Sequence, residues 1–277
     1  MILTLEKYHE KYRSLIETLL TEDEFVKNDT LNCLEEFPEC AVMVRSDTDI
    51  VAIGVYTGKS EMTSMTLTVS PSRRKEGIGS FLLTALEEEM MKEGVQEIIC
   101  DYKINDSVRT FLHKKGYEDW FRSNHMIYNG DDLSVGQISV SQYTDKDYEA
   151  VQKIFSEAFH RMRLSVGLES NLSKASEEEK SSYLEKSEDI FVLRANHEIV
   201  AAVMVDKNEI DKIAVAVDKQ GLGYGKELLA YTVNRLKERG FTEINLWVVE
   251  GNPARILYEQ SGFKLNRLHE FMRKKLK

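Results

Sequence analysis

The stretch best suited to chemistry is a glycine-rich loop. It lies in residues 220–229, which read QGLGYGKELL and follow a short apolar segment at 213–217. Glycine adopts backbone conformations that a Cβ would forbid, and it lets a ligand lie against the main chain. Successive amides at the start of a helix, where the helix dipole is positive, favour phosphate or pyrophosphate. A single loop of this kind is equally compatible with a helix entered through a tight turn that binds nothing.

The chain contains a second copy of this loop. The residues from Val69 read VSPSRRKEGIGSFLLTA, and those from Val215 read VAVDKQGLGYGKELLAY. One offset of 146 residues relates the paired glycines of the two loops, and it also relates Gly116 to Gly262. Agreement on one offset indicates an internal duplication, and two copies are too few for a solenoid array.

Both copies share one pattern: Arg or Gln, two residues, Gly, one residue, Gly, with a strand before and a helix after. In the second half a downstream segment joins it, comprising Asn252, Ala254, Leu257, Tyr258, Gly262 and Phe263. Together these segments resemble the GNAT superfamily of N-acetyltransferases. The resemblance implies an α/β fold with two tandem GNAT-like domains, each a mixed, mostly antiparallel sheet flanked by helices. It also implies acetyl-CoA as the donor of an acetyl group that passes directly from the thioester to a primary amine.

The resemblance places acetyl-CoA in the second half, with its pyrophosphate on the glycine loop and its pantetheine along the end of the preceding strand. The residues expected to bind it are Val215, Val217, Gln220, Gly221, Leu222, Gly223, Tyr224, Gly225, Lys226 and Asn252. Asn252 departs slightly from the family pattern, because it lies six residues before Tyr258, where a spacing of seven is usual.

Tyr258 occupies the place of the family acid that protonates the departing CoA thiolate. Its counterpart in the first half is Leu112, which has no proton to donate. The alternative role for Tyr258 is packing between a helix and the sheet. Glu209 lies six residues before Val215, where some family members carry the base that deprotonates the amine. Its alternative role is that of a solvated glutamate at the start of a strand.

The two halves differ at these positions, since the first half has Thr63 and Met65 in the places of Glu209 and Asp211. Strict alternation along the strand would place on one face Glu209, Asp211, Ile213, Val215 and Val217. We therefore predict a degenerate N-terminal domain over residues 1–130 and a catalytic C-terminal domain over residues 137–277. A polar, glycine-flanked segment at 129–136 is the expected linker.

Composition narrows the function further. The 277 residues suit two domains, and a net charge of −10 argues against a nucleic-acid partner, which would need a basic face. The cysteines lack C-x-x-C spacing and the histidines lack paired metal spacing, so we expect reduced thiols and no metal. No leader or long apolar run is present, which predicts a cytoplasmic protein without a membrane span.

Three readings remain open at this point. In the first, the second half transfers acetyl groups to a small amine or to a peptide terminus. In the second, the protein binds CoA as a sensor without turnover. In the third, both halves are active, because strand amides can polarise a thioester without any particular side chain.

Overall fold

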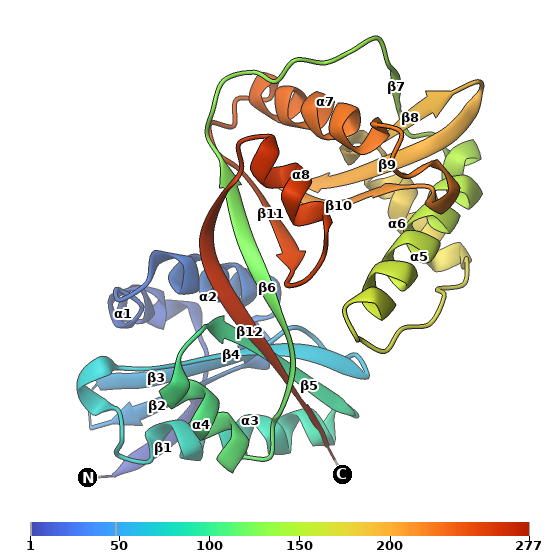
Figure 1. The fold of residues 1–277 in the computed structure, drawn as a ribbon. Coiled ribbons are helices and arrows are strands. Elements are labelled where there is room, and N and C mark those ends of the chain that lie inside the picture. Colours follow the sequence, from blue (N-terminus) through green and yellow to red (C-terminus); the bar gives the residue numbers. More distant parts are fainter. Residues whose placement is uncertain (1, 48, 277) are drawn as a thin grey trace. The chain divides into compact units, whose positions relative to one another are not determined.

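The computed structural model describes residues 2–47 and 49–276, in which helices and strands build an α/β fold (Figure 1). The chain divides into two compact units. Unit 1 contains residues 1–120 and 270–277, and unit 2 contains residues 121–269. None of the helices within the described ranges combines the length and the apolar character that a bilayer span requires.

Unit 1 has the sheet order β1-β2-β3-β4-β5-β12. The pairs β1–β2, β2–β3 and β3–β4 are antiparallel, and β4 and β5 are parallel. Helices α3 and α4 pack on one face of this sheet and α1 and α2 on the other. Its elements are β1 (Leu3–Lys7), α1 (Arg13–Leu19), α2 (Glu24–Glu36), β2 (Ala41–Ser46), β3 (Asp49–Tyr56), β4 (Met62–Val69), α3 (Ile78–Lys92), β5 (Glu97–Lys103) and α4 (Asp106–Lys114).

Unit 2 has the sheet order β12-β6-β11-β10-β9-β8-β7, in which β10 and β11 pair parallel. Its elements are β6 (Glu118–Tyr128), β7 (Ser139–Gln142), α5 (Tyr148–Ser165), α6 (Glu177–Glu185), β8 (Ile190–Ala195), β9 (Glu198–Asp206), β10 (Glu209–Val215), α7 (Tyr224–Glu238), β11 (Ile244–Val249), α8 (Ala254–Gln260) and β12 (Lys264–Lys275). Strands β6 and β12 contribute to unit 2 their residues 121–128 and 264–269.

Two hydrophobic cores lie on opposite faces of the unit 2 sheet. One joins β9, β10 and β11 to α7 and α8, and the other joins β8, β9 and β10 to α5 and α6. Figure 1 shows α7 and α5 on opposite sides of β9 and β10. Because both faces of β9 are covered, residues 199–205 form a continuous apolar run. We call the face that packs against α7 and α8 the α7 face, and the face that packs against α5 and α6 the α5 face.

Several element boundaries differ from those that the apolar spacing predicts, which are a helix at about 6–20, a shorter helix at about 31–36 and two strands near 117–121 and 125–128. The first helix, expected from residue 6, begins at Arg13, because β1 extends to Lys7 and pairs with β2. Helix α2, expected from residue 31, begins at Glu24, where the Asp23 side chain accepts a hydrogen bond from the Phe25 amide at 2.9 Å. Two short strands expected at 117–121 and 125–128 form the single strand β6.

The expected linker at 129–136 is fixed along α7. The Leu133 amide donates to Asn234 Oδ1, and Asn234 Nδ2 donates to the Leu133 carbonyl, both at 2.8 Å. The Gly136 amide donates to Glu227 at 2.6 Å. This segment therefore packs as part of unit 2, and the domain limits at residues 130 and 137 stay a prediction.

Candidate active site

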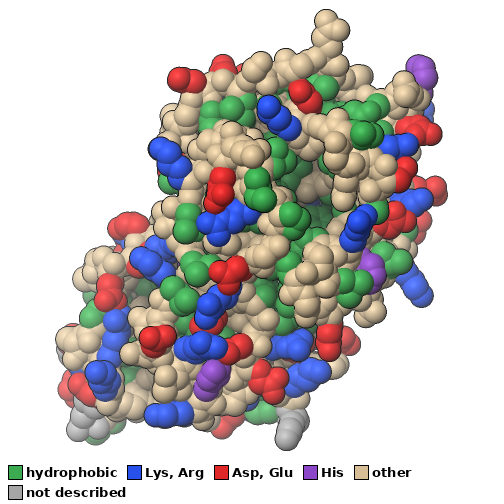
Figure 2. All heavy atoms as spheres, in the orientation of Figure 1, with side chains coloured by type: hydrophobic (Ala, Val, Ile, Leu, Met, Phe, Trp, Pro, Cys, Tyr) green, Lys and Arg blue, Asp and Glu red, His purple; other side chains and the backbone are tan. Residues whose placement is uncertain are grey.

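The site is built around a fork between β10 and β11. These two strands pair only where Glu209 and Ile210 meet Asn245 and Leu246, whereas β10 continues to Val215. Beyond the last pair, the strand register within unit 2 gives β10 no neighbour on its β11 side. Figure 2 shows a hollow lined by hydrophobic side chains in the region that Figure 1 labels α8 and β10. An open strand edge of this kind offers backbone hydrogen-bonding groups to an extended ligand.

The glycine loop follows the end of β10. Gly221 and Gly223 have φ values of 80° and 89°, in the left-handed region where a side chain is strained. A Cβ added to either glycine would meet nothing within 4 Å. Backbone conformation, and not crowding by the protein, therefore requires glycine here, and the space beside the loop is open to a ligand.

Helix α7 starts from this loop with Gly223 as its N-cap. The Lys226 amide donates to the Gly223 carbonyl at 3.0 Å, while the first amides of a helix have no intrahelical acceptor. Gly225 packs closely, since a Cβ there would lie 3.5 Å from both Val215 and Leu257. Leu222 and Lys226 are exposed at the rim of the loop. Free amides and the positive end of a helix dipole are the groups that favour a phosphate-like anion.

Two polar side chains hold the ends of the fork. The Gln220 side chain donates through Nε2 to the Val215 carbonyl at 3.2 Å, which ties the loop back to β10. Asn252 Oδ1 accepts from the Ala254 amide at 3.0 Å, and the Asn252 amide donates to the Val249 carbonyl at 3.0 Å. Asn252 therefore caps the start of α8 beside the end of β11. Val217 lies just beyond β10, in a 3₁₀ turn at Val217–Lys219.

Tyr258 lies on α8 in the same hydrophobic cluster as Val215 and Tyr224. Its side chain is buried and its ring centroid lies 6.0 Å from that of Phe263. Burial raises the pKa of Tyr258 to about 12. Within the ranges that the structure describes, no hydrogen bond engages its hydroxyl. The group is thus a protonated donor at neutral pH, on the α7 face of the fork.

Glu209 is the first residue of β10 and is partly buried. Burial, followed by the charges of Asp211 and Asp206, raises the pKa of Glu209 to about 7. A carboxylate with this pKa is divided between its two protonation states at neutral pH, as an efficient general base requires.

The predicted sharing of one face by Glu209, Asp211, Ile213, Val215 and Val217 is wrong. The pairing of β10 with β9 shifts between Ile210 and Lys212, so Asp211 is the extra residue of a β-bulge. A one-residue shift inverts the alternation of all residues beyond it. Ile213 and Val215 therefore lie with Ile210 on the α7 face, whereas Glu209 lies on the α5 face. The carboxylate and the Tyr258 hydroxyl approach the fork from opposite faces.

Unit 1 has a loop of the same backbone geometry. Lys75 and Gly77 have φ values of 66° and 85°, and Gly77 is the N-cap of α3. Arg74 Nε donates to the Val69 carbonyl at 3.2 Å, which reproduces the contact between Gln220 and Val215. The loop architecture is therefore duplicated together with the sequence.

Unit 1 has different side chains from unit 2 at the positions of Tyr258 and Glu209. Leu112 is buried at the place that corresponds to Tyr258. Thr63, at the place of Glu209, is buried and donates its hydroxyl to the Thr57 carbonyl at 3.0 Å. From Met65 to Val69 the register of β4 with β3 runs without a shift, so Met65, the counterpart of Asp211, is paired with Tyr56 and does not form a bulge.

The polar, serine-rich segment at 164–186 predicts a loop and a helix, and the structure has α6 after a loop in this segment. Gln152 and Ser156 are buried polar residues of α5 that both donate to the Ser173 carbonyl, at 3.0 and 3.1 Å. A Cβ on Gly251, just after β11, would lie 3.4 Å from Val166 at the end of α5. The α5 face of the fork is thus bordered by an anchored segment. In the sequence, the sign of this anchoring is that Gln152 and Ser156 lie among the buried apolar residues of α5.

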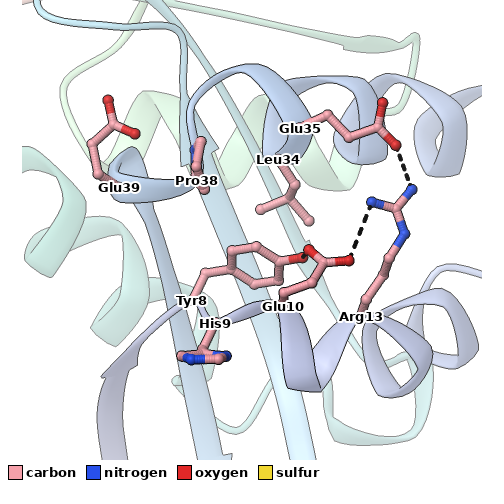
Figure 3. Close-up of a pocket in the computed structure, with 8 residues that line it drawn as sticks. All are labelled: Tyr8, His9, Glu10, Arg13, Leu34, Glu35, Pro38 and Glu39. Carbon is pink, nitrogen blue, oxygen red and sulfur yellow. Dashed lines mark hydrogen bonds and ion pairs between the residues drawn. The ribbon is translucent and has the colours of Figure 1, made fainter.

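A separate cavity of about 530 Å³ lies in unit 1. Figure 3 shows Arg13 between Glu10 and Glu35, and its guanidinium pairs with Glu35 at 2.6 Å. The residues that line it are Tyr8, His9, Glu10, Arg13, Leu34, Glu35, Pro38 and Glu39. None of the residues expected to bind cofactor or to catalyse belongs to it.

Comparison with known proteins agrees with this geometry. Residues 5–117 and 148–263 match the model of the acetyltransferase (GNAT) family. The chain belongs to the GNAT family. Its two matched regions are the two copies that the internal offset relates, so the tandem GNAT arrangement expected from the sequence is confirmed.

Individual relatives add detail to the GNAT assignment. Over 64 residues the chain is 39% identical to the [ribosomal protein bS18]-alanine N-acetyltransferase of Haemophilus influenzae. This matched stretch is 23% of this chain and 44% of that protein. A GCN5-related N-acetyltransferase from Sphaerobacter thermophilus superposes with a TM-score of 0.77 at 17% identity, over 99% of this chain and 95% of that one. A tandem GNAT protein from the clavulanic acid biosynthesis pathway gives 0.65 at 14% identity, over 99% and 98%. The structural matches show the fold alone.

Proposed function

We propose that the protein is an acetyl-CoA-dependent N-acetyltransferase whose unit 2 transfers an acetyl group to a primary amine. The observation that carries this proposal is the fork itself. An open glycine loop leads into it, a buried hydroxyl donor lies on one face, and a carboxylate with a pKa of about 7 lies on the other.

The loop and the strand edge account for cofactor binding. The amides of residues 221–226 would hold the pyrophosphate, helped by the dipole of α7. The pantetheine would lie along Val215–Val217, where β10 has separated from β11. Gln220 would position the loop through its bond to the Val215 carbonyl, and Asn252 would fix the end of the fork.

The two proton transfers of the reaction take place on opposite faces of the fork. Acetyl-CoA supplies a thioester whose carbonyl carbon accepts the amine. Glu209 takes the proton from the ammonium form of the acceptor, so that the nitrogen lone pair can form the new C–N bond. Backbone amides of β10 stabilise charge on the carbonyl oxygen. Tyr258 gives its proton to the sulfur as the C–S bond breaks.

Direct transfer explains why acid and base should lie on opposite faces. A thioester bound in the fork would have Tyr258 on the side of its sulfur and Glu209 on the side from which an amine reaches its carbonyl carbon. Tyr258 then reaches the leaving sulfur, and Glu209 reaches the incoming amine. The bulge at Asp211 supports this arrangement, because it puts Glu209 on the face opposite that of Ile213 and Val215.

The acceptor is proposed to be a small amine or a peptide terminus. The partial relative from Haemophilus influenzae is named for acetylation of an alanine in a ribosomal protein, which supports the second class.

Cys33, Cys40 and Cys100 are free thiols, and burial raises the pKa of each. Unreactive free thiols support a cytoplasmic location.

Unit 1 is proposed to have no turnover. Its loop geometry supports retained affinity for CoA or another phosphate-bearing ligand, while Leu112 and Thr63 supply neither acid nor base. A CoA sensor without turnover is the second candidate function, and the preserved loop in unit 1 favours it for that unit.

An assay of thiol release tests the proposal. The full chain is mixed with acetyl-CoA and a panel of primary amines, and free CoA thiol is followed with time. We expect amine-dependent release in the wild type and a strong decrease in Glu209→Gln. Calorimetric binding of CoA without release for any amine would instead establish the sensor function.

A further inference from the structure

The bulge in β10 brings a lysine onto the α5 face of the fork. Lys212 pairs in register with Met204, which is buried in the core cluster beneath α5 and α6. Ala214, two residues further along β10, belongs to the same cluster. Because directly opposed residues of an antiparallel pair lie on one face of the sheet, Lys212 lies on the face that also contains Glu209.

Lys212 follows Glu209 at the point where the strands separate. Strands β10 and β11 pair only at Glu209 and Ile210, so Lys212 is the first residue on this face beyond the pairing. Asp211 is the extra residue of the bulge, so two strand positions, ~7 Å, separate the backbones of Glu209 and Lys212. An acceptor whose amine lies at Glu209 would therefore have the lysine side chain within reach.

The Lys212 ammonium has no counter-ion from the protein within the described ranges. Its side chain is only partly exposed, and no ion pair or hydrogen bond of the described residues engages it. Burial and the charges of Asp211 and Asp206 raise the pKa of Glu209 to about 7, whereas an ammonium beside this carboxylate would lower it. Partly buried charges are normally paired, so Lys212 is suited to an anion that arrives with a ligand.

Unit 1 has no such charge at the corresponding position. The offset of 146 residues relates Lys212 to Thr66. Thr66 lies on the corresponding face of β4, because its neighbours Met65 and Leu67 both belong to the cluster on the α3 side. The lysine thus occurs only in the unit that also has Glu209. This difference associates Lys212 with the reaction of unit 2 and not with the fold that both units share.

We propose that Lys212 determines the specificity for the acceptor, and that its ammonium binds a carboxylate that the acceptor carries on a short stem from its amine. The proposal rests on the proposed acetyl transfer in unit 2. Free amino acids and peptides with an acidic residue beside the terminal amine share this chemistry. A charge-assisted hydrogen bond at a partly exposed site changes affinity by about tenfold. Lys212 should therefore affect the KM of the acceptor far more than kcat.

Matched acceptors test the role of the carboxylate. Thiol release by the full chain is measured with alanine, β-alanine and 4-aminobutyrate, and with the amide of each, which lacks the carboxylate. The amidated dipeptides Ala-Asp and Ala-Asn form the corresponding pair for a peptide terminus. We expect the KM of at least one acid to be about tenfold below that of its neutral counterpart, and the set that contains it identifies the source. Equal KM values within every pair overturn the proposal.

Substitutions of Lys212 separate its charge from its stem. Lys212→Met keeps an apolar stem and should raise the KM of the preferred acid to that of its neutral counterpart, with the KM for acetyl-CoA unchanged. Lys212→Arg keeps the charge and should keep the preference. Lys153→Met is the control, because it removes a lysine of α5 whose side chain is 71% exposed, and it should change no KM. A folded Lys212→Met variant that still prefers the acid refutes the role of Lys212.

Reversal of the charge provides a second test, which measures binding without turnover. In calorimetry with CoA present, the wild type should bind 4-aminobutyrate more tightly than 1,4-diaminobutane, and Lys212→Glu should reverse this order. The reversal is also decisive if the methionine variant does not fold, and an unchanged order in a folded Lys212→Glu variant overturns the proposal. Thiol release without any preference for an acid refutes the role of Lys212 alone. Absence of amine-dependent thiol release in the wild type refutes the proposed function itself.

Discussion

Glu209→Gln should make the protein less active and more stable at the same time. The pKa of Glu209 is raised from 4.5 to about 7 in the folded state, which corresponds to a cost of up to about 3 kcal/mol for the ionised carboxylate. Glutamine has nearly the same shape and no charge, so it removes this cost. The same substitution removes the base that the amine needs.

The sign of the pH dependence follows from proton linkage. Between pH 4.5 and pH 7 the unfolded chain loses the Glu209 proton while the folded chain keeps it, so the unfolded state binds fewer protons. The free energy of unfolding therefore falls as pH rises through this window and levels off above it. In Glu209→Gln this contribution is absent, and the stability gain over wild type should appear above pH 7 and vanish below pH 4.5.

The assay is urea unfolding of the full chain at pH 5 and pH 8, with thiol release measured on the same samples. Glu198→Gln is the matched control, because Glu198 begins β9 as Glu209 begins β10 and its side chain is 72% exposed. We expect Glu209→Gln to be more stable than the wild type by a larger margin at pH 8 than at pH 5. We also expect its kcat to be about a hundredfold lower than that of the wild type. A more stable Glu209→Gln variant with full activity would refute the base role. If the variant and the wild type had equal free energies of unfolding at both pH values, the burial argument would be refuted.

Three further outcomes are expected. Tyr258→Phe should lower kcat by about a hundredfold with CoA affinity and melting temperature nearly unchanged; a folded variant with wild-type kcat would refute the acid role of the hydroxyl. Gln220→Ala should raise the KM for acetyl-CoA by about fivefold through loss of one hydrogen bond to Val215, and an unchanged KM would remove its positioning role. A fragment of residues 121–269 should melt cooperatively, whereas 137–269 lacks the β6 residues that pair with β11 and should aggregate; equal circular-dichroism melts would contradict this.

The duplication and the glycine loops could be predicted from sequence because they depend on local rules. A residue with positive φ before a helix requires glycine or a strained substitute, and both loops have the predicted backbone, with Gly223 and Gly77 as N-caps. The family match then confirmed the fold class.

The orientation of Glu209 could not be predicted, because it depends on one extra residue in β10. Nothing in the run from Glu209 to Val215 marks Asp211 as a bulge, since bulges arise from pairing with a neighbouring strand. The same limit applies to β6, whose length is set by its pairing with β11 and not by its own alternation.

The most direct test of the central claim compares the two loops in one titration. Gly77 and Gly223 have φ values of 85° and 89°, both are helix N-caps, and both have open space around them, so valine strains each to a similar degree. In the full chain, Gly77→Val should still bind CoA by calorimetry at the unit 2 loop, and adding Gly223→Val to it should abolish that binding. If the double variant binds CoA as tightly as Gly77→Val does, while remaining folded, the cofactor does not lie on the loop at residues 221–226.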